Sequence, residues 1–528
     1  MKSFFNNNFI PIFFGTFLSK LIGFIRQLFI AGAYGIGIAY DAYNYAYIIP
    51  GFLIITIGGI NGPLHNALVA VLTPLKTKEA SLILNKVSLK ITLFLFLIGC
   101  FVFLKANFII SVIAPSLNLE IQTIAKEQLR ILSPCIPLSG FIGLSYGALN
   151  TKNKYLISSL SPSIISLVTV IFISFSWLNN FQDFGISYFY KSNLLATATL
   201  TGTLIQFLIQ LYEIYKIGLL KIKITWLKAT NAERRIFNLI VPASLASGLG
   251  QINVFVDMFF ISSFRGAASG LAYGNLLIQA PLGILANTVI LPLLPKFSKL
   301  INENKKEKVK QILIESIEYC FLSTIFLGGL FITFNGLIVE LVFQRGAFDY
   351  QAVSIVRKIF IAYAVGIPFY LYRDLLIRFY YSIERTKLPF QITLLGIVLN
   401  IIFDWILTGA PTINNGNLFG FNYGATGVVL SSGFVNLLVC SILSLGLKIN
   451  DYKIPNLLLL KKVAFKVFSC VIGSSISLYI LNQFNYTEIN FPSKLTILII
   501  GSALFTIIYY VLTKFFKVNK LFLKPIIK

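Results

Sequence analysis

The sequence predicts an all-α membrane protein that crosses the bilayer about fourteen times. Of its 528 residues, 56% are hydrophobic and only 12% are charged, about half the charged fraction of an average soluble protein. The mean hydropathy is +0.81. Apolar runs long enough to cross ~30 Å of hydrocarbon recur from one end of the chain to the other. Each run must form a helix, because a helix satisfies its own backbone hydrogen bonds in lipid.

The apolar runs give the elements in chain order. The first six are centred roughly on residues 20, 58, 100, 138, 166 and 203, and the next six roughly on residues 248, 282, 326, 367, 399 and 436. Two further runs lie near residues 469 and 505. An even number of spans places both termini on the same side of the membrane.

The distribution of charge identifies that side. A formal net charge of +25 would suggest a nucleic-acid partner in a soluble chain. Here most of the 44 basic residues fall in alternate loops and at the two ends, which is the pattern of cytoplasmic loops in membrane proteins. The sequence therefore predicts cytoplasmic termini and no nucleic-acid partner.

Several chemistries are disfavoured. The five cysteines lie far apart inside apolar runs, and His65 is the only histidine, so a thiolate or histidine metal site is not expected. The chain has no G-x-x-x-x-G-K-[ST] motif for ATP hydrolysis. A membrane enzyme acting on polyprenyl phosphates is disfavoured too, because the predicted outer loop at 411–423 carries no charge. We predict a transporter without a cofactor and not an enzyme.

The chain contains a predicted internal repeat. When residues 15–50 are set against 246–281, Gly35 falls on Gly266 and Pro50 on Pro281. The shift covers six spans, an even number, so both copies have the same orientation, as in transporters built from parallel repeats. The predicted domains are an N-lobe at 1–228, a C-lobe at 229–450, and spans 13 and 14 with a basic tail at 451–528.

Lys20 and Arg26 stand inside the first apolar span. Two ionised side chains there cost about 5–7 kcal/mol on the insertion scale, and such residues persist where they face a hydrated cavity or a partner. We interpret them as cations that an N-lobe cavity offers to an anionic ligand. Two alternatives stay open: pairing with a carboxylate such as Asp41, or extension of Lys20 to the membrane surface.

The second half carries the opposite charge. Asn253 and Asp257 are four residues apart, and so are Asn400 and Asp404, which places each pair on one helical face. Carboxylate and amide oxygens suit hard cations, so Na⁺ or H⁺ is the expected coupling ion. The alternatives are salt bridges from Asp257 and Asp404 to Arg373 or Arg378, and hydrogen bonds between helices.

The order of motifs resembles the MurJ (MviN-type) lipid II flippases of the multidrug/oligosaccharidyl-lipid/polysaccharide exporter (MOP) superfamily. The opening SKLIGFIR, followed by YDAY, carries this resemblance. Further matches lie at 147–164, 251–262, 289–299 and 375–389.

The resemblance implies a fold of fourteen helices with two six-helix lobes and a central cavity. It implies alternating-access transport of undecaprenyl-pyrophosphate-linked peptidoglycan precursor, lipid II, from the inner to the outer leaflet of the bacterial inner membrane, for cell-wall synthesis and cell shape. Lys20, Arg26 and Asp41 match charged cavity positions of the family. Its sodium site is matched by Asp257, Asn400, Asp404, Ser432 and the carbonyl of Val428. Spans 13 and 14 would line a groove for the lipid tail.

This chain departs from the family pattern in its fixed charges. The second span has no arginine pair after Pro50, and Leu276 stands where span 8 usually has an arginine. Compensation is expected from Arg130, Arg265, Arg373 or Arg378, or the substrate is bound differently. The alternatives are a flippase for another polyprenyl-linked oligosaccharide, a cation-coupled drug exporter and a lipid scaffold. The sequence leaves open whether other cell-wall synthesis proteins bind the chain.

Overall fold

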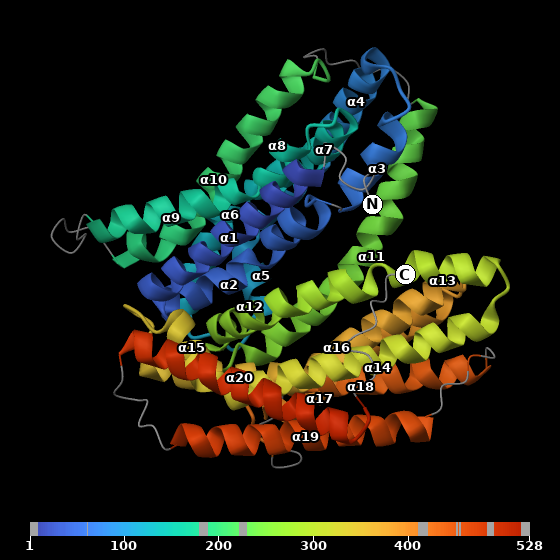
Figure 1. Cartoon of the computed structure of the whole chain (residues 1–528). Coiled ribbons are helices and arrows are strands. Elements are labelled where there is room, and N and C mark those ends of the chain that lie inside the picture. The colour runs from blue at the N-terminus through green and yellow to red at the C-terminus, as the bar shows by residue number, and fades with distance from the viewer. Residues whose placement is uncertain are drawn as a thin grey trace. The chain divides into compact units, whose positions relative to one another are not determined.

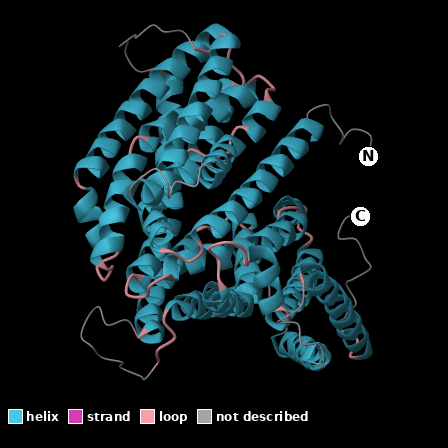
Figure 2. Ribbon diagram, turned by 90° about the vertical axis from the view of Figure 1, so that its left-hand side faces the viewer, coloured by secondary structure: helices cyan, strands magenta, loops and turns pink. Residues whose placement is uncertain are grey.

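The computed structural model describes residues 9–60, 62–178, 188–220, 230–409, 421–449, 452, 456–482 and 490–518. Every regular element in these ranges is a helix (Figure 1, Figure 2). The all-α prediction is confirmed. By contacts the chain divides into two compact units, Met1–Ser269 with Arg345–Phe348, and Gly270–Gln344 with Asp349–Lys528.

The first unit contains twelve of the described elements. In chain order they are α1 Phe9–Tyr34, α2 Ile38–Gly51, η1 Phe52–Ile57, α3 Pro63–Leu72, α4 Thr77–Leu104, α5 Ala106–Ile113, α6 Leu119–Leu132, α7 Cys135–Thr151, α8 Tyr155–Leu160, α9 Ser163–Leu178, α10 Tyr188–Lys216 and α11 Asn231–Ile261. Within this unit α2 packs on α6, α4 and α3 on α7, α10 on α9, and α1 on α8 and α9.

The helix α12 begins in the first unit and ends in the second. The elements from there onward are α12 Ala267–Leu285, η2 Ala286–Ile290, α13 Leu293–Asn302, α14 Lys306–Thr333, α15 Asn335–Phe343, α16 Tyr350–Ser382, α17 Lys387–Thr408, α18 Ala425–Ile449, α19 Asn456–Asn482 and α20 Phe491–Phe515. The core of the second unit is apolar and aromatic, with α16 packed on α14 and α18, and α19 packed on α14 and α20.

Ten described helices are long and apolar enough to cross a membrane, and the pair α6–α7, bent by 45°, would make an eleventh span. The protein is therefore a multi-pass membrane protein. The runs predicted near residues 58, 166 and 282 are not among these spans. The first is interrupted at Gly58, α9 is short, and α12 gives way to η2.

A proline precedes two of the interruptions. Pro50 lies inside α2 and Pro281 inside α12, and each lacks the backbone N–H that an α-helix needs. Each helix then widens into a π-helix, η1 or η2. The glycines that precede the two helices, Gly35 and Gly266, both have positive φ, 53° and 78°, a conformation that glycine adopts without strain. Positions paired by the predicted repeat thus share their backbone geometry.

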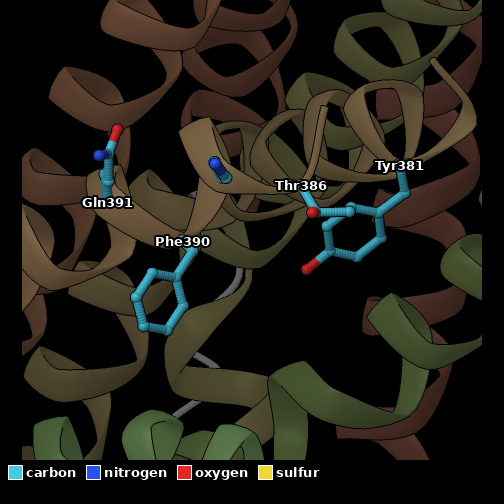
Figure 3. A pocket seen from close by; sticks show the side chains of 5 residues that line it. Tyr381, Thr386, Phe390 and Gln391 are labelled. Carbon is cyan, nitrogen blue, oxygen red and sulfur yellow. The ribbon is translucent and has the colours of Figure 1, made fainter. Parts of the chain in front are cut away.

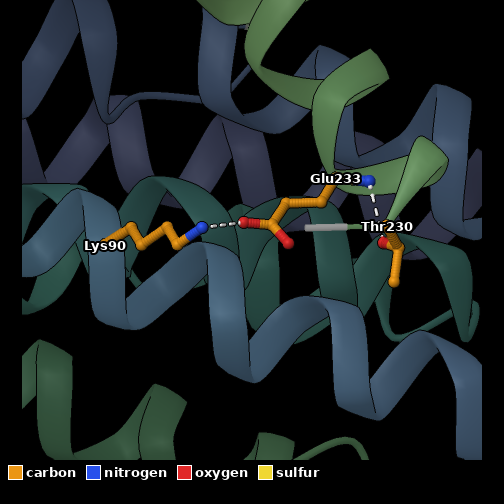
Figure 4. A network of polar contacts seen from close by, with 3 residues as sticks. All are labelled: Lys90, Thr230 and Glu233. Carbon is orange, nitrogen blue, oxygen red and sulfur yellow. Dashed lines mark hydrogen bonds and ion pairs between the residues drawn. The ribbon is translucent and has the colours of Figure 1, made fainter. Parts of the chain in front are cut away.

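The start of α11 is anchored within the first unit. Thr230 caps the helix by accepting the N–H of Glu233 at 3.2 Å. The buried Glu233 carboxylate forms an ion pair with Lys90 of α4 (Figure 4). Contacts thus group α11 with the first unit, whereas the predicted lobe boundary at 228/229 concerns the repeat and stays a prediction.

Candidate functional site

Arg26 of α1 has spare hydrogen-bonding capacity and, unlike Arg130 and Arg373, no polar contact through its other guanidinium nitrogens in the described residues. Its side chain is half-buried, and its Nε is buried without a hydrogen-bond partner. No carboxylate of the described residues forms an ion pair with it. A guanidinium carries five N–H donors. Arg26 can therefore donate to an anionic ligand without first giving up an acidic partner.

Three tyrosines of α2 lie within electrostatic range of Arg26. Its charge acts on the hydroxyl groups of Tyr40, Tyr43 and Tyr47. The rings of Tyr40 and Tyr43 stack with centroids 6.2 Å apart, and those of Tyr43 and Tyr47 at 5.3 Å. The Tyr43 hydroxyl also shares a 2.9 Å hydrogen bond with Thr199 of α10. Stacking restricts these side chains, so the surroundings of Arg26 are held in place.

Lys20 lies on the same helix as Arg26 but is exposed on the protein surface. No ion pair of Lys20 is present among the described residues. Six residues of helix at ~100° each separate the two side chains by about 120° around the axis. The two cations are therefore not stacked in one column, and the contribution of Lys20 to a ligand site stays a prediction.

Asp41 of α2 has structural partners. Its carboxylate is 2% exposed and accepts hydrogen bonds from the N–H of Gly266 at 2.5 Å, the N–H of Ser269 at 2.8 Å and the hydroxyl of Ser269 at 2.6 Å. These groups lie at the start of α12, where backbone N–H groups lack intrahelical acceptors. The alternative of an ion pair between Asp41 and Lys20 or Arg26 is not seen. Whether Asp41 also meets a ligand stays a prediction.

We expect Asp41→Ala to lower the free energy of unfolding by about 2 kcal/mol, because the start of α12 loses a charged cap. Thermal unfolding of the purified protein in detergent measures this loss. Asn44→Ala is the control, since Asn44 lies on the same helix and donates one 2.8 Å hydrogen bond to the carbonyl of Tyr40. Equal losses in the two variants would contradict the capping role of Asp41.

In the second unit, α17 and α18 bring predicted ion-site residues together. Asn400 and Asp404 are buried, 1% and 0% exposed, and Asn400 Nδ2 donates to Asp404 Oδ2 at 2.9 Å. The Ser432 hydroxyl of α18 donates to Asn400 Oδ1 at 3.3 Å. Val428 is buried one turn before Ser432. The packed pair of helices thus presents carboxylate, amide and hydroxyl oxygens, the donor set that a hard cation prefers.

The polar network extends to residues that the sequence did not single out as part of this site. Asn436 Nδ2 donates to the carbonyl of Ser432 at 2.6 Å, and Arg373 of α16 donates to Asn436 Oδ1 at 2.5 Å. A chain of polar contacts therefore runs from Asp404 through Asn400, Ser432 and Asn436 to a guanidinium. The four-residue spacing of Ser432 and Asn436 in an apolar span is the signal that could have identified Asn436.

Asp257, the fifth predicted ion-site residue, belongs to the first unit. It is half-buried in α11, and Asn253 Oδ1, one turn earlier, is buried without a hydrogen-bond partner. The other four residues belong to the second unit. The complete sodium site therefore stays a prediction.

The four arginines considered as compensation for missing family charges have polar surroundings. Arg130 pairs with Glu127 at 3.3 Å, and Arg378 with Asp374 at 3.2 Å. Arg265 is exposed and its charge acts on Asp41, while Arg373 bonds to Asn436.

A hollow of about 490 Å³ lies at the turn between α16 and α17. It is lined by Tyr381, Thr386, Lys387, Phe390 and Gln391 (Figure 3). The rings of Tyr381 and Phe390 point to the same side of the turn (Figure 3). This hollow shares no residue with the predicted ligand and ion sites.

Comparisons with known proteins agree on one family. A family model described as "Lipid II flippase MurJ" matches residues 30–499. The chain is 34% identical to the "Probable lipid II flippase MurJ" of Synechocystis sp. over 428 residues, which cover 80% of this chain and 77% of that protein. It is 26% identical to the "Lipid II flippase MurJ" of Thermosipho africanus, with 94% of each chain covered.

Solved structures agree with the sequence comparisons. The structure "Lipid II flippase MurJ, inward closed conformation" matches with a TM-score of 0.74 and 25% identity, covering 96% of this chain and 100% of that chain. A multidrug resistance MATE transporter of the MOP superfamily, in an inward-facing conformation, matches with a TM-score of 0.62 and 13% identity, covering 82% and 94%. The latter likeness concerns the fold alone.

Proposed function

Because this chain belongs to the MurJ family of lipid II flippases, we propose that it moves undecaprenyl-pyrophosphate-linked peptidoglycan precursor, lipid II, from the inner to the outer leaflet. The protein is a transporter and not an enzyme. The substrate has a diphosphate and a large polar headgroup, which cannot cross hydrocarbon unaided. A flippase must therefore supply charged and polar groups at the depth where hydration is lost.

The observation that supports this function most directly is the environment of Arg26. A half-buried guanidinium without an acidic partner, on a helix that can span the membrane, is costly unless an anion or water reaches it. A diphosphate forms charge-assisted hydrogen bonds with such a group. We propose Arg26, with Lys20, as the diphosphate-binding pair, and Asp41 as a residue that keeps α2 beside the start of α12.

Alternating access follows from the proposed repeat. We propose fourteen crossings, in which the interrupted segment 38–72, the short helix α9, and α12 with η2 join the eleven long spans. Two lobes, at 1–228 and 229–450, would rock about the substrate, and 451–528 would add spans 13 and 14. The matching geometry at Gly35 and Gly266, and at Pro50 and Pro281, supports this division.

We propose Na⁺ as the coupling ion, held by Asn400, Asp404, Ser432 and the carbonyl of Val428, and joined by Asp257. The support is the buried oxygen cluster of α17 and α18. Binding and release of one cation would move charge through the membrane potential, which is worth about 2.3 kcal/mol per charge per 100 mV. That amount is sufficient to bias a transition between two states of a transporter.

We propose a location in the bacterial inner membrane with cytoplasmic termini. The segment at 298–310, where α13 ends and α14 begins, is then cytoplasmic, so Lys308→Cys, at an exposed position, should react with an impermeant maleimide only after the cells are permeabilised. Tyr350, 63% exposed, is the first residue of α16 and follows the next loop, and Tyr350→Cys should react in intact cells. The reverse pattern would invert the topology.

The function is tested by depletion rescue combined with a leaflet-accessibility assay for lipid II. Cells depleted of their native flippase should grow when they express this chain, and lipid II should become accessible at the outer leaflet. If lipid II stays inside while another polyprenyl-linked oligosaccharide is exposed, the substrate assignment is wrong and the flippase class stands. If neither lipid is moved, the transport function itself is wrong.

A further inference from the structure

Aromatic side chains gather between the first half of α19 and the end of α20. The rings of Phe465 and Phe516 stack with centroids 4.7 Å apart, and Phe468 meets Phe516 edge-on at 6.0 Å. Phe515 packs against Phe516 at 5.3 Å. The helices α19 and α20 run side by side (Figure 1). These contacts bring the first half of α19 beside the last turn of α20.

Lysines neighbour these rings in the sequence. Lys461, Lys514 and Lys517 are exposed, and in the described part of the chain none of them forms an ion pair. The carboxylate of Glu318 in α14 is paired with Lys462. The backbone carbonyl of Glu318 accepts a hydrogen bond from Lys466 Nζ at 2.9 Å. The positive charge at this end of the two helices is thus not neutralised by Glu318.

Two of the four phenylalanines are exposed. Phe515 is 77% exposed and Phe468 is 53% exposed. Apolar residues continue along the exposed face of α19, where Val467 is 45% and Val471 is 56% exposed. A surface of phenyl rings that joins aliphatic side chains on one side and lysines on the other matches the boundary between acyl chains and headgroups.

We propose that Lys461, Lys514 and Lys517, together with the four phenylalanines, form a binding site for the headgroups of anionic phospholipids. The aliphatic face lies among the acyl chains, the rings lie at the level of the ester groups, and the ammonium groups meet the phosphates. The choice of a lipid rather than an acidic protein rests on the apolar face, which has to be covered by hydrocarbon. This site shares no residue with the proposed diphosphate and ion sites.

The test uses the full-length chain with Phe515→Trp as a local reporter, reconstituted in vesicles of phosphatidylcholine with increasing phosphatidylglycerol. Brominated phosphatidylglycerol should quench the reporter at least about fivefold more effectively than brominated phosphatidylcholine, the factor that corresponds to one surface lysine. Signal from Trp177, Trp226 and Trp405 is subtracted by using the parent chain. The triple variant K461Q/K514Q/K517Q should reduce the preference to about one.

The control is K299Q/K306Q/K308Q, which removes the same charge from exposed lysines of α13 and α14 and should keep the preference. Equal quenching by the two lipids in the parent reporter would overturn the site, and so would an equal loss in both triple variants. If K461Q/K514Q/K517Q does not fold, the lipid preference of the parent reporter is measured again in 0.5 M NaCl. A preference that salt leaves unchanged is not electrostatic and overturns the proposal.

Discussion

Arg26→Ala should abolish growth of cells that depend on this chain for their lipid II transport. The variant removes the half-buried guanidinium whose Nε has no partner within the protein. Loss of charge-assisted hydrogen bonds to a diphosphate should slow transport about 100-fold. The leaflet-accessibility assay measures the rate directly, and the amount of protein in the membrane shows that insertion is unaffected.

Two further variants define the contribution of Arg26. Arg26→Lys keeps the charge but not the planar fork of donors, so it should recover part of the rate. Arg234→Ala removes an exposed arginine near the start of α11 and should transport normally. Growth of Arg26→Ala cells at the normal rate would remove Arg26 from the substrate site.

The second large effect is expected from Asp404→Asn, which should remove the response of transport to a Na⁺ gradient. Asparagine keeps the size of the side chain and can still accept from Asn400, but it lacks the negative charge that holds a cation. The apparent affinity for Na⁺ should fall at least about tenfold, since hydrogen bonds and ligands lose strength when a charged partner becomes neutral. Transport in proteoliposomes, measured across a series of Na⁺ gradients, gives this affinity.

Asp374→Asn is the matched control for this measurement. It makes the same chemical change in the same unit, at a residue of α16 that pairs with Arg378 and is 39% exposed. We expect it to keep the ion response. If Asp404→Asn transport follows the Na⁺ gradient as the parent does, the proposed cation site is wrong, and the flippase assignment is unaffected.

Hydropathy predicted the helical class and the positions of the long helices because each span needs its own run of apolar residues. It did not predict the breaks near residues 58 and 282. The hydropathy averaged over a window of residues remains high across Gly58 and across the π-helix after Pro281, because both lie in apolar sequence. The breaks depend on backbone geometry, which a hydropathy average does not register.

The site was predictable where its partners are close in sequence. The four-residue spacing of Asn400 and Asp404 gave a contact that the structure contains. The partners of Asp41 lie 225 and 228 residues away, and Arg373 reaches Asn436 across 63 residues. Such contacts depend on which helices pack together, and one sequence without its tertiary structure does not specify that.

The two π-helices, η1 and η2, each place an extra residue in a helical turn, at positions that the predicted repeat makes equivalent. A π turn accommodates one residue more than an α turn, and this surplus residue can pass along a helix by exchanging one hydrogen-bond partner at a time. When it moves past a side chain, that side chain turns by about 100° and shifts by about 1.5 Å along the axis. A shift of the π turn next to Pro50 or Pro281 would therefore re-aim side chains in discrete steps.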